Sequence, residues 1–376
     1  MKILTLTYEY PPLGGGGGKV AQGLAENLAQ RGHKVDVITM GYKDLPKQET
    51  AGNLTITRLA GIRSKTESCH MGEMLPHEIY TLYRASKLLR RNNYDLIHAH
   101  FLFPDGFAGR ILASIFKLPL MVTAHGSDVP GYNPDRFKLL HILLNPIWHF
   151  TVAGVTRIIS PSEHLITLIK KEAEKAPTQV IPNGFDPSRF CIDRPRQARV
   201  LVVTRLFQRK GVQYILQAVA KLKQQVEVHI VGDGHYLEAL KQLDESLGTR
   251  AKFWGWLDNN SDELKELYET SSIFAFTSDQ ENFPINLLEA MCAGNAIITT
   301  DSSGTSEVVG DAAIIVPRQD PEAIRAALEK LLDSPELAKK LGEKARARLE
   351  QNFSWQAVTE RYEASMQEIV AAKIPS

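Results

Sequence analysis

Residues 281–294 read Glu-Asn-Phe-Pro-Ile-Asn-Leu-Leu-Glu-Ala-Met-Cys-Ala-Gly and follow closely on the apolar segment Ile273–Thr277. The apolar segment predicts a buried strand. Pro284 is suited to the first position of a helix and Gly294 to its end, which predicts a helix of about ten residues. The unpaired N–H groups and the dipole at the start of such a helix favour an anion. The stretch therefore predicts a ligand site at the carboxyl edge of a sheet.

Two carboxylates belong to this stretch, Glu281 before the helix and Glu289 within it. At a rise of about 1.5 Å per residue, Glu289 lies about 7–8 Å along the helix from its start. An extended ligand with a central diphosphate, a sugar at one end and a ribose at the other would match this layout. By themselves, two glutamates at arbitrary spacing are more often a solvated loop residue and a solvated helix residue than a ligand-binding pair. The choice between these two interpretations therefore depends on the other motifs of the chain.

The first half of the chain alternates strands and helices. A strand at Ile3–Thr7 leads through the glycine run Gly14–Gly18 into a helical pattern over residues 20–28, and a second strand follows at Val35–Thr39. This order is a βαβ unit of a doubly wound sheet. Further strands are predicted at Leu54–Leu59, Asp95–Ala99, Leu120–Ala124, Arg157–Ser160 and Thr178–Ile181, with helices near His77–Arg91 and Gly106–Phe116.

A second alternating series follows the segment Asp186–Gln197, whose Pro, Arg and Asp content predicts a linker. A chain of 376 residues is too long for one compact core of usual size, so two α/β domains are expected. The terminal segment Ser354–Val370 has helical periodicity. The strands of the second series are predicted at Arg199–Thr204, Val226–Val231, Lys252–Trp254, Ile273–Thr277, Ala296–Thr300 and Ala313–Ile315.

The composition is that of an ordinary globular protein, with 43% hydrophobic and 23% charged residues. The formal charge of +1 hides a modest basic excess in residues 1–190, which carry 22 Lys and Arg against 16 Asp and Glu. No basic run interleaved with aromatic residues predicts a nucleic-acid groove. The three cysteines are scattered and typical of reduced thiols, and Glu9 interrupts the apolar start, so a cytoplasmic protein without a signal peptide is expected.

Several motifs together resemble one family. The segment 281–294 is similar to the glutamate-pair motif of the retaining glycosyltransferases of family GT4, or glycosyltransferase group 1, which have the GT-B fold. The resemblance covers nearly the whole chain and implies two Rossmann-like α/β domains facing a central cleft, with the C-terminal helix crossing back to the first domain. The other matching motifs are Gly14–Gly18, Ile181-Pro182-Asn183-Gly184-Phe185-Asp186, residues 203–211, Val231-Gly232-Asp233-Gly234 and Phe353-Ser354-Trp355.

The family fold implies the domain boundaries. We expect an acceptor-side domain at residues 1–186, completed by the C-terminal helix 355–376. The donor-binding domain is expected at residues 198–354.

The resemblance assigns the donor diphosphate to Arg205 and Lys210. A guanidinium can bind phosphate oxygens in pairs and an ammonium acts as a point charge, and both stabilise charge that develops on a departing diphosphate. Glu281 is implied to hydrogen-bond the donor sugar and Glu289 to hold the ribose hydroxyls. The family frequently has glycine where this chain has Pro284, which lacks an N–H, so a sugar contact there falls to other backbone groups. The candidates for that contact are Asn282, Phe283 and Ile285.

Six further residues are assigned to the donor, namely Gly16, Gly17, Gly232, Gly234, Trp256 and Leu257. The glycines let backbone approach a ligand closely. The two residues after the strand near Trp254 border the nucleobase or pack in the core. The glycine run does not match G-x-G-x-x-G and the second strand ends at Thr39 without an acidic residue, which disfavours a dinucleotide-dependent dehydrogenase.

His125 follows a predicted buried strand and resembles the family's cleft histidine, which contacts the donor sugar. Asp128, three residues later, is an acceptor-side candidate. His98 and His100 alternate on one strand and therefore share a face. A metal pair would need a third ligand, so hydrogen-bonding or acceptor-side roles are favoured for these two histidines.

No Asp-x-Asp occurs in the chain, so neither a metal nor another cofactor is expected at the diphosphate. The expected activity is metal-independent, front-face transfer of a hexosyl group from a nucleoside-diphosphate sugar to an acceptor hydroxyl in glycan, glycolipid or glycoconjugate biosynthesis. The donor is expected to be a UDP-sugar, with GDP-mannose as the other choice. The alternatives are a sugar-nucleotide epimerase of the same fold and a non-catalytic sugar-nucleotide binder. The sequence does not disclose the acceptor.

A peripheral contact with the cytoplasmic face of a membrane is a further hypothesis. It is motivated by the aromatic and apolar region Phe137–Phe150 and by a basic helix that carries Arg84, Lys87, Arg90 and Arg91. A buried helix explains the apolar region equally well.

Overall fold

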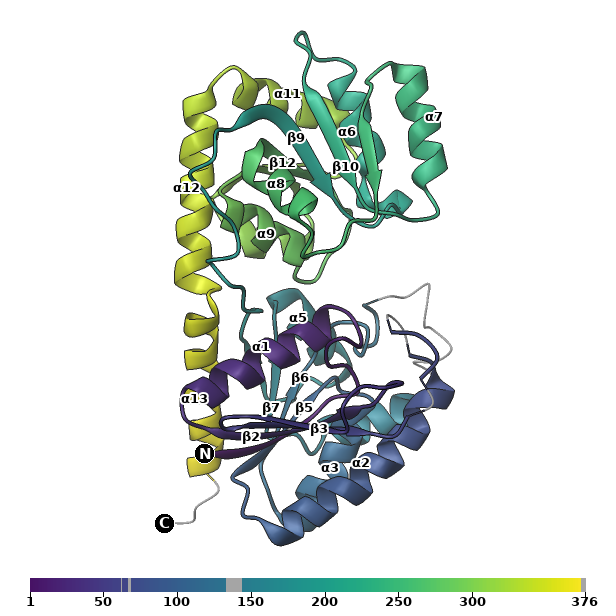
Figure 1. Cartoon of the computed structure of the whole chain (residues 1–376), viewed down its shortest axis with the longest axis vertical. Helices are drawn as coiled ribbons and strands as arrows, with labels where there is room; N and C mark the ends of the chain where they lie inside the picture. The colour runs from purple at the N-terminus through teal and green to yellow at the C-terminus, as the bar shows by residue number, and fades with distance from the viewer. Residues whose placement is uncertain (62, 67–68, 133–143, 373–376) are drawn as a thin grey trace. The chain divides into compact units, whose positions relative to one another are not determined.

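The computed structural model describes residues 1–61, 63–66, 69–132 and 144–372. The chain folds into two compact units (Figure 1). Unit 1 consists of Met1–Gly184 and Trp355–Ser376, and unit 2 consists of Phe185–Ser354. Each unit has its own mainly parallel sheet with helices packed on it, so the expected α/β class is confirmed.

Unit 1 contains an eight-stranded sheet of order β3-β4-β2-β1-β5-β6-β7-β8. All neighbouring strands are parallel except β3, which pairs antiparallel with β4 at the edge. The chain order reverses between β1 and β5, so the loops that follow these two strands flank a switch point, where ligands bind in open α/β sheets. The strands are β1 Lys2–Leu6, β2 Lys34–Met40, β3 Gln48–Ala51, β4 Leu54–Leu59, β5 Leu96–His100, β6 Leu120–Thr123, β7 Arg157–Ser160 and β8 Thr178–Val180.

The C-terminal helix belongs to unit 1. Val358, Tyr362 and Met366 of this helix pack with Leu24 and Leu28 in one buried apolar cluster. Figure 1 shows the C-terminal helix beside α1. The helices of unit 1 are α1 Gly16–Gln30, α2 Met71–Arg91, α3 Asp105–Phe116, α5 Glu163–Glu172 and α13 Trp355–Ala371.

Unit 2 contains a six-stranded parallel sheet of order β11-β10-β9-β12-β13-β14. Here the order reverses between β9 and β12, which places the loops after these strands at the switch point. The strands are β9 Gln197–Val203, β10 Glu227–Val231, β11 Lys252–Gly255, β12 Ser271–Phe276, β13 Ala296–Thr300 and β14 Ala313–Val316. The helices are η1 Gln208–Lys210, α6 Val212–Val219, α7 Leu237–Leu247, α8 Asp262–Thr270, α9 Ile285–Ala293, α10 Ser303–Val309, α11 Pro321–Leu332 and α12 Pro335–Asn352.

The segment predicted as a linker, residues 186–197, instead packs on unit 2. Phe190 is buried in the apolar core of that unit. The arginines of the segment are anchored as well, because Arg194 pairs with Glu269 at 3.2 Å and Arg196 donates to the carbonyl of Ser271 at 2.9 Å. The linker prediction was wrong because the polar side chains of this segment form hydrogen bonds and ion pairs with unit 2.

Two helix starts also differ from the sequence prediction. Helix α1 begins at Gly16, so Gly16, Gly17 and Gly18 form its first turn, and only Gly14 and Gly15 of the glycine run lie in the turn before it. Helix α2 begins at Met71, six residues before the predicted start, and contains Pro76. The N-cap residue His70 and Glu73 form a capping box, which stabilises the start of the helix ahead of Pro76.

Candidate functional site

The loop after β9 carries the two basic residues predicted to bind a diphosphate. Its conformation is fixed by the loop after β12, since the amide of Asp279 donates to the carbonyl of Arg209 at 2.9 Å and the Thr277 hydroxyl donates to that of Gly211 at 3.0 Å. Gly211 has φ +73°, and a Cβ there would lie 2.1 Å from the carbonyl oxygen of Thr277. Only glycine therefore allows the two loops to approach so closely.

Lys210 and Glu281 form an ion pair across the switch point of unit 2, from the Nζ atom to Oε1. Both side chains are 12% exposed. Arg205 differs, because its side chain is exposed and, within the described part of the chain, makes no ion pair or side-chain hydrogen bond. The structure thus brings the predicted cations to one sheet edge, with one of them already neutralised by a predicted carboxylate.

Helix α9 begins next to this ion pair. Pro284 is its N-cap residue, with φ −73° and ψ 117°, rather than its first helical residue as predicted. It provides no side-chain cap for the first N–H groups, and the helix ends at Gly294 with φ +73°, as predicted. Asn282 and Phe283 are buried, and the Phe283 ring packs edge to face on Phe353 with the ring centroids 5.6 Å apart. Ile285 is partly buried against the same core, so only backbone groups of this segment are suited to ligand contact.

Glu289 is held by partners that sequence reasoning missed. The Tyr268 hydroxyl donates to its Oε2 at 2.9 Å, and Arg189 Nη2 lies 3.4 Å from its Oε1. The Glu289 side chain is 7% exposed. Burial, together with the neighbouring carboxylate, raises the pKa of Tyr268 well above its ordinary value, so the hydroxyl stays a donor. Arg189 lies in the supposed linker, where nothing in the sequence signals this contact.

The two glycines after β10 serve the packing of the sheet edge. A Cβ on Gly232, which has φ +135°, would lie 1.8 Å from the carbonyl oxygen of Thr204, and one on Gly234 would lie 2.3 Å from that of Leu206. The loop after β10 therefore packs closely against Thr204 and Leu206, the two neighbours of Arg205 in the loop after β9. Beyond β11, Trp256 is 69% exposed, which removes core packing as its role. Leu257 packs against the core.

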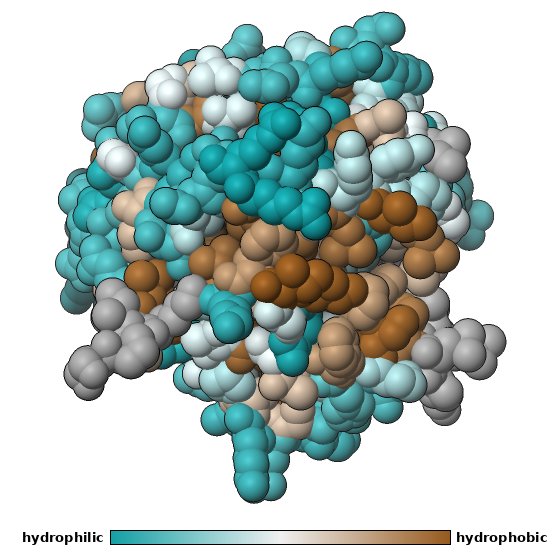
Figure 2. All heavy atoms as spheres, turned by 90° about the horizontal axis from the view of Figure 1, so that it is seen from below, coloured by the Kyte–Doolittle hydropathy of each residue, from teal (hydrophilic) through white to brown (hydrophobic). Residues whose placement is uncertain are grey.

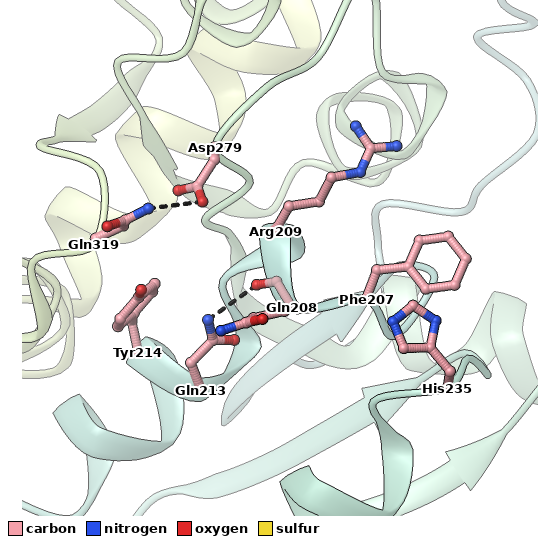
Figure 3. Close-up of a pocket in the computed structure, with 8 residues that line it drawn as sticks. All are labelled: Phe207, Gln208, Arg209, Gln213, Tyr214, His235, Asp279 and Gln319. Atoms are coloured by element: carbon pink, nitrogen blue, oxygen red, sulfur yellow. Dashed lines mark hydrogen bonds between the residues drawn. The ribbon is translucent and has the colours of Figure 1, made fainter. Parts of the chain in front are cut away.

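A pocket of about 420 Å³ lies beside the Arg205 loop in unit 2. Figure 3 shows its wall, in which the rings of Phe207 and His235 stack with centroids 4.8 Å apart. On the opposite side Gln319 donates to Asp279 Oδ2 at 2.9 Å, while the Arg209 guanidinium points away from these acceptors. The remaining residues of the lining are Gln208, Gln213 and Tyr214.

The candidate residues of unit 1 gather around the start of α1. A Cβ on Gly17 would lie 2.5 Å from the Phe101 ring and 3.3 Å from the ring of His125. Gly16 is the first residue of the helix, and a Cβ added to it would have no other atom within 4 Å. Glu9 fixes the preceding turn by accepting a hydrogen bond from the amide of Gly15 at 3.1 Å. The structure therefore brings the glycine run and His125 together.

Three histidines, of which His98 and His100 are buried and His125 is partly exposed, form a neutral network at the ends of β5 and β6. His100 Nδ1 and His125 Nε2 lie 3.1 Å apart, and His98 Nε2 lies 2.9 Å from the Thr123 hydroxyl, which in turn contacts the Tyr362 hydroxyl at 3.1 Å. Burial lowers the pKa of both His98 and His125 to about 3. Burial and the two neighbouring rings hold the pKa of His100 well below its ordinary value. These rings can accept and donate hydrogen bonds at neutral pH without carrying charge.

Asp128 is a structural acceptor for the loop that carries His125. Its Oδ1 accepts from the amides of His125 and Gly126 at 3.0 and 2.9 Å, and its Oδ2 accepts from Leu102 at 2.7 Å. This residue positions the loops after β5 and β6, and its carboxylate is committed to three amides.

Two family models match the chain in adjoining halves. The model described as Glycosyltransferase Family 4 matches residues 14–189, and the model described as Glycosyl transferases group 1 matches residues 192–348. An uncharacterized glycosyltransferase of Methanocaldococcus jannaschii is 28% identical over 94% of this chain and 95% of its own length. The N-acetyl-alpha-D-glucosaminyl L-malate synthase of Bacillus anthracis is 24% identical, with 94% of each chain covered.

Solved structures share the fold. Sucrose-phosphate synthase of Thermosynechococcus elongatus superposes with a TM-score of 0.80 at 21% identity, covering 99% of this chain and 100% of that one. Anabaena HepE in complex with UDP has a TM-score of 0.77 at 20% identity, covering 98% of this chain and 100% of that one. The fold is that of the GT-B glycosyltransferases, as expected from the sequence motifs.

Proposed function

The chain belongs to the glycosyltransferases of group 1 and family 4, and from this premise we propose that it transfers a hexosyl group from a nucleoside-diphosphate sugar to an acceptor hydroxyl with retention of configuration. The observation that carries the proposal is the exposed Arg205, whose side chain has no hydrogen bond or ion pair among the described residues, together with the Lys210–Glu281 ion pair and the start of α9, where Pro284 provides no side-chain cap. Together these groups form a site for a diphosphate at the switch point of unit 2.

Each basic group has a separate task in this proposal. Arg205 binds diphosphate oxygens directly, because its guanidinium has no other partner among the described residues. Lys210 exchanges its Glu281 partner for the diphosphate as negative charge develops on the leaving group. Fixed cations that act where charge develops lower the barrier of the chemical step.

The reaction proposed is a front-face substitution. The bond between the anomeric carbon and the donor phosphate breaks, the acceptor oxygen forms its bond on the same face, and a phosphate oxygen takes the hydroxyl proton. No protein nucleophile is required, which agrees with Glu281 being paired with Lys210. Glu281 and His125 are proposed to hydrogen-bond the donor sugar instead, and the pKa of His125, lowered to about 3 by burial, keeps this imidazole neutral.

Metal independence at the diphosphate is part of the proposal. It is supported by the basic residues, which can take the place of a cation, and by a sequence without Asp-x-Asp. UDP is the proposed nucleotide, supported by the UDP named in the HepE complex, with GDP as the other choice. Glu289 is proposed to accept from the ribose hydroxyls and the exposed Trp256 to stack on the base.

Incubation with UDP-glucose, UDP-galactose, UDP-N-acetylglucosamine, ADP-glucose and GDP-mannose tests the function. We expect release of one nucleotide that depends on an added acceptor, with a product of retained anomeric configuration by NMR. Release without an acceptor would indicate a hydrolase, conversion of the donor itself an epimerase, and binding without turnover a sugar-nucleotide binder. Each of those three results would overturn the transferase proposal.

A membrane contact through α2 is a second proposal. Figure 2 shows apolar side chains gathered on the face seen from below, the side of unit 1 on which α2 and α3 lie in Figure 1. The helix adds a basic stretch, Arg84–Arg91, at its C-terminal end, so an anionic lipid surface is the occupant that fits both its charge and its apolar side chains. No helix in the described residues is long and apolar enough to cross a bilayer. The exposed apolar residues of α2 are Leu75, Ile79, Tyr80 and Tyr83.

Sedimentation with vesicles tests this contact. We expect binding to vesicles that contain phosphatidylglycerol and little binding to pure phosphatidylcholine, with loss of binding in Ile79→Ser/Tyr83→Ser. Ile315→Ser, an exposed apolar position of unit 2, is the matched control and should bind as the wild type does. Equal binding of both variants would remove α2 from the interface. Residues 137–143 of the apolar region considered from sequence lie outside the described residues.

A further inference from the structure

A cluster of three titratable side chains lies inside unit 1, apart from the residues proposed for the donor. His77 and Glu78 are neighbours on the buried face of α2, and Asp105 is the first residue of α3. Their exposed fractions are 0%, 6% and 0%. One ligand atom of each residue can be chosen so that all three lie within 4.8 Å of one another. It is the one such group of three among the residues that the structure describes.

Four polar atoms of this cluster have no hydrogen-bond partner among the described residues. They are Nδ1 of His77, both carboxylate oxygens of Glu78, and Oδ1 of Asp105. The remaining atoms are used, since His77 Nε2 lies 3.3 Å from the Thr81 hydroxyl and Asp105 Oδ2 accepts from the amide of Tyr8 at 3.0 Å. Buried polar groups are nearly always satisfied, so four orphaned atoms in one place require a partner.

No lysine or arginine in the described part of the chain pairs with either carboxylate, and within the cluster His77 Nε2 lies 4.0 Å from Asp105 Oδ1. Arg63 is the buried cation of this region, but its donors go to the backbone carbonyls of Lys65, Thr66 and Tyr8. Burial raises the pKa of Glu78 to about 8 and lowers that of His77 to about 4. Burial is the main cause of both pKa shifts, and the positive charge of Arg63 adds to the lowering of the His77 pKa.

We propose that His77, Glu78 and Asp105 bind one divalent metal ion of the zinc type. Two carboxylates neutralise a divalent charge, and a neutral imidazole nitrogen favours zinc over magnesium, which prefers oxygen ligands and water. Ligands about 2.0–2.2 Å from an ion lie at most about 4.4 Å apart, so the cluster needs to contract by less than about 1 Å to hold it. The amino-acid sequence shows no metal-ligand spacing for this site, because Asp105 is far along the chain from His77 and Glu78.

The ion serves the structure of unit 1 rather than the transfer reaction. It joins α2 to the start of α3 and, through Asp105 and the amide of Tyr8, to the loop after β1. The donor-binding residues of unit 2 contribute nothing to it. The inference therefore stands whether or not the proposed transferase activity is found, and it is tested by metal binding alone.

The test uses the full chain stripped of metal with a chelator and titrated with Zn²⁺, Co²⁺ or Mg²⁺. We expect one Zn²⁺ per chain by elemental analysis and a visible Co²⁺ spectrum typical of nitrogen and oxygen ligands. Zn²⁺ at 100 times its Kd should raise the Tm of unit 1 by about 5–10 °C, and Mg²⁺ should have little effect. Absence of stoichiometric Zn²⁺ binding to the folded wild type would overturn the proposal.

Glu78→Gln and His77→Gln are the informative variants, and Glu73→Gln is the matched control in the first turn of the same helix, where glutamine can still accept from the amides of Ser64 and His70. We expect Glu78→Gln to lose the Zn²⁺-dependent rise in Tm while its metal-free form melts no lower than the wild type, because glutamine is uncharged and has nearly the shape of the buried carboxyl group. Glu73→Gln should keep one Zn²⁺ per chain. Retained Zn²⁺ in both cluster variants would place the ion elsewhere and contradict the assignment, while stabilisation by Glu78→Gln with no metal in the wild type would show that the cluster holds a proton instead.

Discussion

The two units handle polar groups at their sheet edges in opposite ways. Unit 1 buries His98 and His100, leaves His125 partly exposed, and holds the pKa of all three rings low through burial. Unit 2 keeps its groups charged, with Lys210 and Glu281 paired and 12% exposed. Neutral buried hydrogen bonds are suited to orienting a sugar, and charges near the surface are suited to an anion that binds and leaves.

The two sheet edges are therefore expected to respond differently to substitution. Removing a ring from this neutral network costs stability, because it leaves hydrogen-bonding partners such as the Thr123 hydroxyl without their contact. A partly exposed charge can be removed at small cost to the fold, and the loss then appears in ligand binding and turnover.

The largest effect is expected for Arg205→Ala. Because this side chain is exposed and uncommitted among the described residues, its removal should leave the Tm unchanged and lower kcat by about 100-fold to 1,000-fold, the range for loss of one group that stabilises developing charge. Nucleotide release with the preferred donor measures it. Arg209→Ala, an exposed arginine of the same loop whose side chain lies by the pocket in Figure 3, is the control and should retain activity. Equal losses in both variants would contradict a specific role.

A double-mutant cycle separates charge from packing at the ion pair. Lys210→Met leaves the Glu281 carboxylate partly buried without its partner, so we expect a loss of about 3 kcal/mol in the free energy of unfolding. Lys210→Met/Glu281→Gln should recover most of this stability while kcat stays about 100-fold low. Urea unfolding and initial rates measure the two quantities. Recovery of wild-type kcat in the double variant would show that the pair is only structural.

The histidine network predicts acid sensitivity of unit 1. The pKa of His98 and that of His125 are about 3 in the folded protein, below the unfolded value, so the unfolded chain takes up protons first as the pH falls. Stability present above about pH 6.5 is therefore lost toward pH 3, by about 2 kcal/mol for each histidine at pH 5. Urea unfolding at pH 7.5 and pH 5 tests this.

The matched variants for the acid sensitivity are His98→Asn and His149→Asn. His98→Asn should flatten the pH dependence of the free energy of unfolding, because one buried titrating ring is gone. His149 is exposed, and its replacement should leave the pH dependence as it is in the wild type. Identical profiles for the wild type and His98→Asn would contradict the assignment of acid sensitivity to this network.

The smallest effect is expected for Trp256→Ala. Loss of one stacking contact with the base should weaken nucleotide binding about fivefold, corresponding to about 1 kcal/mol. The Tm should not change, because the side chain is 69% exposed. Calorimetric titration with UDP measures the change, and Ile315→Ala, another exposed apolar position of unit 2, is the control. An unchanged Kd would remove Trp256 from the nucleotide site.

Local patterns predicted most of the strands and the ends of several helices. The apolar runs of β4, β7 and β13 were predicted to the residue, since they are buried strands with clear boundaries. The edge strand β3, Gln48–Ala51, was missed because all four of its residues are exposed and carry no apolar signal. Helix starts depended on capping and on glycine contacts, which periodicity does not detect.

The alternating α/β architecture, the glutamate pair and the basic loop could all be inferred from the amino-acid sequence, because spacing along the chain encodes buried faces and turn chemistry. Which charged groups meet became known from the folded chain alone. It paired Lys210 with Glu281, gave Glu289 to Tyr268 and Arg189, and brought Asp105 to His77 and Glu78. The physical reason is that ion pairs and buried polar contacts depend on distances across the fold, and residues far apart in the chain leave no local pattern from which those distances can be read.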